Sequence, residues 1–182
     1  MARAVSAVSR RAFVATLAGA VPVLALPRQL LAKAMGARAL EFVHTHTGER
    51  LAVEYFGGGT YVPDALTTIN HFLRDFRTGD VHSIDPHLLD LLHSLTGLTG
   101  ARRPFQVISG YRSPVTNDML RHKSEGVAAG SLHMQGQAID IRVGDVPLDG
   151  LRRAALALRG GGVGYYPKSD FVHVDTGRVR TW

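Results

Sequence analysis

The chain has 182 residues, of which 45% are hydrophobic and 20% charged, a composition that excludes a wholly disordered protein and fits one packed domain with a short appendage. Its net charge of +6 and its pI of about 10.2 are typical of nucleic-acid or membrane-surface binders. However, the first 34 residues hold five basic side chains and no acid, which leaves 16 basic against 15 acidic residues in the remainder. The remainder is nearly neutral, so we expect no nucleic-acid partner.

The N-terminal segment has the pattern of an export signal. The pair Arg10 and Arg11, followed by Phe13, matches the twin-arginine pattern, and an uncharged apolar run follows at residues 14–26. This run is shorter than the roughly 20 residues that span a bilayer. We therefore expect residues 1–34 to be a twin-arginine export signal and residues 35–182 to form a single periplasmic domain without a stable membrane span. The alternative is an uncleaved membrane anchor.

Local patterns predict short strands and helices along the rest of the chain. Alternation with period two indicates strands, and apolar residues at i, i+3, i+4 and i+7 indicate helices. The expected order is a hairpin of strands at 39–43 and 51–56, a helix from 63 to the Thr-Gly-Asp at 78–80, a second helix from the Asp-Pro pair at 85–86 to Gly97 or Gly100, a strand at 105–108, a short helix at 114–121, a strand at 138–143, a helix at 148–158 and paired strands at 162–166 and 171–175. This order predicts an α+β fold with helices on one face of a small antiparallel sheet.

Two of the nine histidines lie in contexts that indicate a metal site. His133 lies in a loop that leads into the strand carrying Asp140, and His173 lies on the last of the expected strands. If these strands are neighbours, two imidazoles and one carboxylate converge and leave a fourth position for water, as in catalytic zinc sites. The alternatives are that each histidine is a structural hydrogen-bonding residue and that Asp140 pairs with Arg112 or Arg142.

Three sequence blocks carry a family resemblance. They are Ser-Gly-Tyr-Arg-Ser at 109–113, Ser-x-His-x-x-Gly-x-Ala-x-Asp at 131–140, and Gly-Val-Gly-Tyr-Tyr-Pro at 162–167 leading into Phe-Val-His-Val-Asp at 171–175. In this order they resemble the LAS zinc metallopeptidases (lysostaphin, D-Ala-D-Ala peptidases, hedgehog), most closely the exported murein endopeptidases of the MepK/YcbK-like group. The resemblance implies a hedgehog/D-Ala-D-Ala-peptidase-like fold, Zn²⁺ held by His133, Asp140 and His173, and hydrolysis of amide bonds in peptidoglycan stem peptides or cross-links.

The resemblance also implies roles for residues around the metal. Arg112 matches the arginine that polarises the scissile carbonyl, and Ser131 matches a position that contacts substrate. Alternatively, Arg112 forms a structural ion pair and Ser131 stabilises a turn. Four aromatic side chains are expected either in a substrate groove or in the core: Tyr111, Tyr165, Tyr166 and Trp182. We expect Tyr111 to contact the substrate. Strand alternation places one of Tyr165 and Tyr166 in the groove and the other in the core.

We expect the general base to be an acidic residue close to His173, the last of the three expected ligands. Many relatives carry an acid three positions before this histidine, which makes Asp170 the expected base. An extended strand places Asp170 on the face opposite His173, so a turn near Ser169 must re-aim it. Asp175 has the favourable parity and is expected to orient a ligand or to act in proton transfer.

The sequence therefore predicts an exported zinc endopeptidase that cuts peptidoglycan cross-links with metal-activated water. The alternatives are a D-alanyl-D-alanine carboxypeptidase and a non-catalytic cell-wall binding protein that retains the fold.

Overall fold

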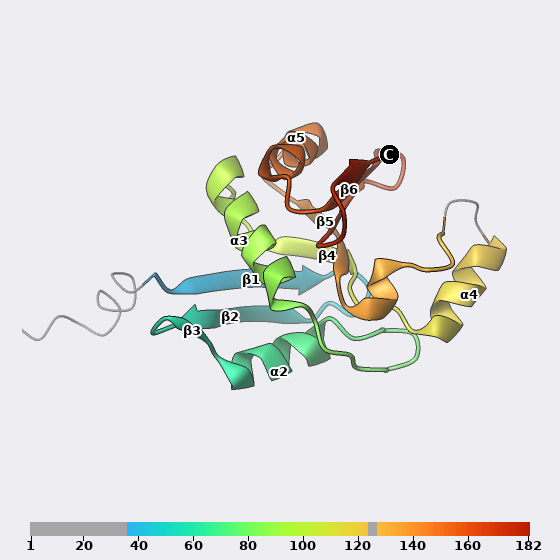
Figure 1. The fold of residues 1–182 in the computed structure, drawn as a ribbon, viewed down its shortest axis with the longest axis horizontal. Helices are drawn as coiled ribbons and strands as arrows, with labels where there is room; N and C mark the ends of the chain where they lie inside the picture. The colour runs from blue at the N-terminus through green and yellow to red at the C-terminus, as the bar shows by residue number, and fades with distance from the viewer. Residues whose placement is uncertain (1–35, 124–126) are drawn as a thin grey trace, which may run out of the picture.

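A computed structural model describes residues 36–123 and 127–182 of the protein, so the expected export signal lies outside the described residues. The chain forms an eight-stranded sheet in the order β3-β2-β1-β4-β5-β7-β6-β8, combined with helices in an α+β arrangement (Figure 1). The strands are β1 (Arg38–His44), β2 (Arg50–Gly57), β3 (Thr60–Tyr61), β4 (Phe105–Ser109), β5 (Ala138–Val143), β6 (Gly162–Tyr166), β7 (Phe171–Asp175) and β8 (Arg180–Thr181). The helices are α2 (Pro63–Phe72), α3 (Pro86–Thr99), α4 (Pro114–Lys123), α5 (Leu148–Leu158) and the short 3-10 helix η1 (Leu132–Gln135).

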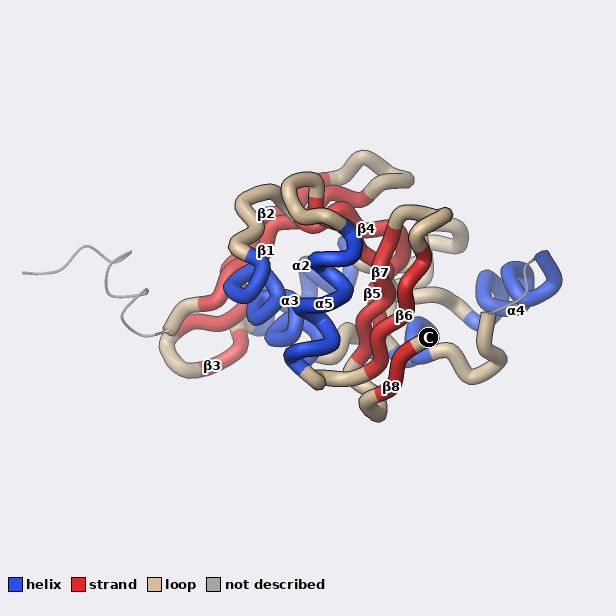
Figure 2. Tube along the Cα trace, turned by 90° about the horizontal axis from the view of Figure 1, so that it is seen from above, coloured by secondary structure: helices blue, strands red, loops and turns tan. Residues whose placement is uncertain are grey.

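Helices α2, α3 and α5 cover one face of the sheet, whereas α4 lies apart from them (Figures 1 and 2). Strand β5 shows how alternation divides the side chains between the two faces. Ile139 and Ile141 are fully buried in the core cluster that also contains residues of the three covering helices. Asp140 and Arg142 therefore face away from this core. The polar face of the sheet is where the expected site residues gather.

The sheet is larger than expected and is mixed instead of antiparallel. β1 pairs with β4 in parallel, and β6 pairs with β8 in parallel. Between β1 and β4 the chain runs through β2, β3 and two helices, so it returns to the starting end of the sheet, which parallel pairing requires. The two-residue strands β3 and β8 are too short for alternation to be visible in the sequence.

Helix α2 ends at Phe72, before the expected end at residues 78–80. The carbonyl of Leu73 accepts the Tyr111 amide at 2.7 Å, a contact from another part of the chain that takes the place of a continued helical bond. The carboxylate of Asp75 then accepts the Arg77 amide and turns the chain. Phe76 consequently lies outside the helix.

The remaining expected elements are confirmed. The first two strands form an antiparallel hairpin, and the side chain of Asp85 caps α3, which ends at Gly100 in the left-handed conformation. The bounds of β5, α5, β6 and β7 agree with the expected ones. In the described part of the chain, no helix combines the length and the apolarity needed to cross a membrane.

Candidate metal centre

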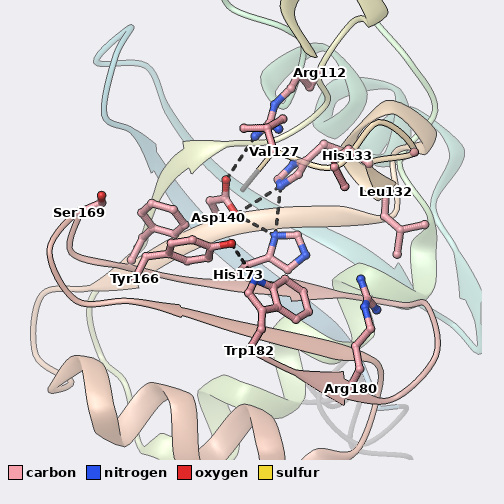
Figure 3. Close-up of a pocket in the computed structure, with 14 residues that line it drawn as sticks. Arg112, Val127, Leu132, His133, Asp140, Tyr166, Ser169, His173, Arg180 and Trp182 are labelled. Atoms are coloured by element: carbon pink, nitrogen blue, oxygen red, sulfur yellow. Dashed lines mark hydrogen bonds and ion pairs between the residues drawn. The ribbon is translucent and has the colours of Figure 1, made fainter. Parts of the chain in front are cut away.

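Three side chains from separate elements converge on the polar face of the sheet (Figure 3). Asp140 and His173 are register partners on the antiparallel strands β5 and β7, which confirms that the two strands are neighbours. His133 comes from η1, which Gly136 ends in the left-handed conformation just before β5. All three residues are buried, and their ligand atoms lie within 4.8 Å of one another. The arrangement has the size of a metal site.

Hydrogen bonds outside the cluster fix which nitrogen of each imidazole faces inward. His133 Nδ1 lies 2.7 Å from the carbonyl oxygen of Gly110, and His173 Nε2 lies 3.0 Å from Asp175 Oδ2. Because both partners accept hydrogen bonds, these two nitrogens carry the protons. The inward atoms, His133 Nε2 and His173 Nδ1, are therefore both lone pairs in the neutral rings, although they lie 3.1 Å apart.

Two facing lone pairs repel unless a cation lies between them. Asp140 Oδ1 adds a negative charge at 2.9 Å from His173 Nδ1 and 3.3 Å from His133 Nε2. Two imidazole nitrogens, each oriented by an outer hydrogen bond, and one carboxylate oxygen are a donor set that fits Zn²⁺. The residues present thus fit the metal that the sequence predicts.

The pKa values of His173 and Asp140 are also shifted in the direction that favours a positive charge in the cluster. Burial lowers the pKa of His173, but hydrogen bonds to Asp140 and Asp175, together with their charges, outweigh it and raise the pKa to about 9. Burial raises the pKa of Asp140, whereas the charge of His133 and hydrogen bonds from both histidines hold it well below its usual range. Both shifts show that the cluster favours a positive charge among its inward-facing atoms.

Asp175 holds the outer side of His173. The residue is fully buried, and its carboxylate accepts hydrogen bonds from the amides of Gly162 and Gly177 and from two guanidinium nitrogens of Arg180. Burial raises the pKa of Asp175, but the hydrogen bonds from His173 and Arg180 dominate and lower it. The carboxylate is a fixed anion that orients the imidazole.

A cavity of about 470 Å³ opens beside the cluster, and Arg112 and Ser131 line it as expected. The guanidinium of Arg112 lies 3.6 Å from Asp140 Oδ2, and its Nε is buried without a partner among the described residues. Burial lowers the pKa of Arg112, although the nearby Asp140 partly offsets this. Of the two arginines considered as partners of Asp140, Arg112 is the nearby one, because Arg142 binds Gln106 and Asp170 instead.

Three expected site residues do not line this cavity, namely Asp175, which lies behind His173, and also Tyr111 and Asp170. The ring of Tyr111 stacks on His82 with the ring centroids 4.8 Å apart, and Tyr111 is not among the residues that line the cavity. Asp170 has a positive φ of 55°, and its carboxylate accepts a hydrogen bond from Arg142 at 2.8 Å. The turn near Ser169 therefore directs Asp170 toward Arg142 and not into the cavity.

A further acid supports the site without lining it. Asp75 is 1% exposed, and its carboxylate accepts the backbone amide and the hydroxyl of Ser113 at 2.9 and 2.7 Å. It thereby fixes the residue that follows Arg112. Nothing in the sequence distinguishes Asp75, because its partner lies 38 positions away.

The chain is similar to known proteins over most of its length. Residues 32–182 match the family described as peptidoglycan L,D-endopeptidase MepK. The peptidoglycan L,D-endopeptidase MepK of Escherichia coli (strain K12) is 50% identical over 145 residues, which cover 80% of this chain and 80% of the relative. The corresponding protein of Shigella flexneri gives the same values. A probable peptidoglycan L,D-endopeptidase MepK of Haemophilus influenzae is 46% identical over 146 residues, covering 80% of this chain and 78% of the relative.

The family match includes all three converging side chains and spans most of the chain, and the relatives are similar over four fifths of it. The resemblance seen in the three sequence blocks is therefore confirmed. This chain belongs to the peptidoglycan L,D-endopeptidase MepK family.

Proposed function

We propose that this chain is a zinc-dependent endopeptidase that hydrolyses peptide cross-links in peptidoglycan. The observation that carries the proposal is the pair of inward lone pairs on His133 and His173, 3.1 Å apart beside the carboxylate of Asp140. The substrate class rests on the relatives, which are named as peptidoglycan L,D-endopeptidases. This name also favours an endopeptidase over a carboxypeptidase or a non-catalytic binding protein.

Different residues of the chain would have different roles in amide hydrolysis. His133, Asp140 and His173 would hold the metal, which when bound supplies Lewis acidity and acidifies a coordinated water. Arg112 carries its charge into the cavity, where a peptide carbonyl that gains negative charge would be stabilised by it. The hydroxyl of Ser131 lines the same cavity and is placed to contact the peptide.

Three acids near the metal centre are candidates for moving protons. Asp140 is the one acid among the described residues that line the cavity, and it serves as a ligand. Asp175 is saturated with hydrogen bonds, which supports an orienting role for it and not a proton-transfer role. Asp170 would have to leave Arg142 to act as the general base.

We further propose that the domain packs like the hedgehog and D-Ala-D-Ala peptidases, and that residues 1–34 direct it to the periplasm by the twin-arginine route. The paired arginines support this route. Replacing both Arg10 and Arg11 with lysine should keep the protein out of the periplasmic fraction of cells. Unchanged export of this double variant would contradict the proposed route.

The decisive experiment is a digest of cross-linked muropeptides, with and without a chelator, read by mass spectrometry. We expect cleavage within the cross-link, its loss on chelation and its recovery with Zn²⁺. The variants His133→Ala, Asp140→Ala and His173→Ala should each lose zinc and activity together, whereas His71→Ala, on the exposed side of α2, should keep both. A purified protein that binds no zinc and cleaves no cross-link would contradict the proposal, and release of terminal D-alanine alone would indicate a carboxypeptidase.

A further inference from the structure

The side chain of Trp182 lies across strand β6 at the edge of the metal centre. Gly164 is the register partner of His173, and a Cβ atom added at Gly164 would lie 2.8–2.9 Å from the indole ring. The backbone of Trp182 is held on both sides, since its amide donates to Val163 and its carbonyl accepts from Tyr165. Absence of a side chain at Gly164 therefore makes room for the indole beside the ligand His173, with the two ring centroids 5.2 Å apart.

The indole fixes the hydroxyl of Tyr166. Trp182 Nε1 donates a hydrogen bond to the Tyr166 oxygen at 2.7 Å. The Tyr166 ring also stacks on Phe171, with centroids 4.5 Å apart, so the side chain is held at both ends. An indole N–H can only donate, and the phenol must therefore direct its own hydrogen to a different acceptor. In the parts of the chain that the structure describes, no hydrogen bond from this hydroxyl is observed.

The hydroxyl faces the cavity at the metal centre. Tyr166 and Trp182 line the cavity together with Arg112, Asp140 and His173. Figure 3 shows the Tyr166 hydroxyl directed toward the converging ligands, on the opposite side of Asp140 from Arg112. Two donors thus approach the same space from different sides.

We propose that the Tyr166 hydroxyl, held by the indole N–H of Trp182, donates a hydrogen bond to the carbonyl oxygen of the peptide bond that is cleaved. The inference rests on the proposed function for the identity of the substrate. Trp182 is then a positioning residue, and Tyr166 is a catalytic residue that shares the developing negative charge with Arg112. A donor already oriented in the free protein stabilises this charge without reorganisation.

The first test compares Tyr166→Phe with the matched control Tyr165→Phe, its neighbour on β6. Loss of one such donor typically costs about 10²-fold in kcat, and we expect this loss for Tyr166→Phe, with a smaller change in KM. Tyr165 packs against the core and Arg152, so its variant should retain kcat. Zinc content should be unchanged in both variants. A Tyr166→Phe protein with wild-type kcat, or one that has lost zinc, would overturn the inference.

The second test moves the indole without altering either aromatic residue. Gly164 is not in the left-handed region, so Gly164→Ala suits the backbone but forces the indole away. Trp182 is the single tryptophan of the chain, and its fluorescence therefore reports on this site alone. We expect a shifted emission and a kcat about tenfold lower, because the phenol keeps its hydrogen but loses its orientation. An emission shift with full kcat would show that Trp182 does not position Tyr166 for catalysis.

A third measurement separates this inference from the proposed function. Metal-free protein is titrated with an intact muropeptide dimer, and binding is followed by Trp182 fluorescence. We expect about threefold weaker binding for Tyr166→Phe and no change for Tyr165→Phe, the size expected for one neutral hydrogen bond. If the wild type cleaves nothing, the proposed function fails, but this difference in binding would still support the hydrogen bond. If the wild type cleaves the dimer and the two variants bind and react alike, only the inference fails.

Discussion

Hydrogen bonds made outside the metal centre decide which nitrogen of each histidine faces inward. The carbonyl of Gly110 holds the Nδ1 proton of His133, and Asp175 holds the Nε2 proton of His173. The two imidazoles therefore offer different ring nitrogens to the same point. Residues outside the cluster thus determine the donor set, and we expect their substitution to change the affinity for zinc.

The variant Asp175→Asn tests this control at the scale of one residue. Its amide cannot accept every hydrogen bond that the carboxylate accepts, and it leaves Arg180 without a counter-ion. We expect zinc affinity to fall about 10–100-fold, as for other residues that orient a ligand. Competition with a fluorescent chelator measures the change. Asp149→Asn, which disrupts an exposed pair with Arg153, is the control, and equal affinities in the two variants would contradict the role of Asp175.

The variant Asp170→Asn tests the acid that the family pattern suggests as general base. Loss of a general base usually costs about 10²–10⁴-fold in rate. Because Asp170 is exposed and binds Arg142 outside the cavity, we expect kcat to remain close to that of the wild type. The measurement is kcat on cross-linked muropeptides. A fall in kcat of about 10²-fold or more would show that Asp170 leaves Arg142 during the reaction.

At the scale of elements, the segment after α2 and the turn before α4 are fastened together by Asp75. Its carboxylate accepts the Arg77 amide from one segment and the Ser113 amide and hydroxyl from the other. Arg112 lies directly before Ser113, and its own amide donates to the carbonyl of His133. The position of the cavity arginine therefore depends on an acid that does not itself line the cavity.

We expect Asp75→Asn to lower the free energy of unfolding by about 2–3 kcal/mol at neutral pH, since it removes buried hydrogen bonds to a charged acceptor. It should also lower kcat/KM by displacing Arg112. Urea unfolding measures the stability, with Asp80→Asn as an exposed control. If Asp75→Asn proves as stable as the control, the carboxylate does not fasten these segments.

The same variant gives a prediction for pH. Burial raises the pKa of Asp75, but hydrogen bonds from Thr116, Ser113 and Arg77 outweigh it and hold the pKa below its usual range. A lowered pKa in the folded state contributes stability above the unfolded value of about 3.9, and this contribution is lost as the pH falls further. The stability difference between wild type and Asp75→Asn should therefore shrink below about pH 4. A difference that stays constant through this range would contradict the assignment.

At the scale of the whole molecule, the proposed metal centre draws on elements that are distant in sequence. The three proposed ligands come from η1, β5 and β7, and the outer hydrogen bonds add the end of β4 and the turn after β7. A ligand that binds only the folded state stabilises it. Zinc should therefore stabilise the entire domain and not the cavity alone.

Thermal unfolding with and without zinc measures this effect. At a free zinc concentration 100 times Kd, the stabilisation is about 2.7 kcal/mol, or roughly 5–10 °C in Tm for a chain of this size. In metal-free protein the raised pKa of His173 contributes stability that is complete below about 6.5 and is lost as the pH rises through about 9. The gain in Tm from zinc should therefore grow over this range. The Tm of His133→Ala should not rise when zinc is added. A rise in Tm equal to that of the wild type would contradict the proposed zinc site.

Sequence patterns alone predicted the features that depend on neighbouring residues. Alternation placed Ile139 and Ile141 in the core and Asp140 on the other face, and the Asp85-Pro86 pair marked the start of α3. The three blocks also identified the family and the three residues that converge. Local backbone geometry and side-chain periodicity suffice for these assignments, because they involve residues a few positions apart.

Tertiary structure decided the features that depend on distant partners. Parallel pairing of β1 with β4 made the sheet mixed, and the Leu73–Tyr111 hydrogen bond ended α2 early. Asp170 lies against Arg142, which is 28 positions away, and Trp182 reaches Tyr166 from 16 positions away. No local pattern encodes such contacts, since they form only when the sheet brings the strands together. The sequence thus determined which three residues converge as candidate metal ligands, and the tertiary structure decided which side chains surround them.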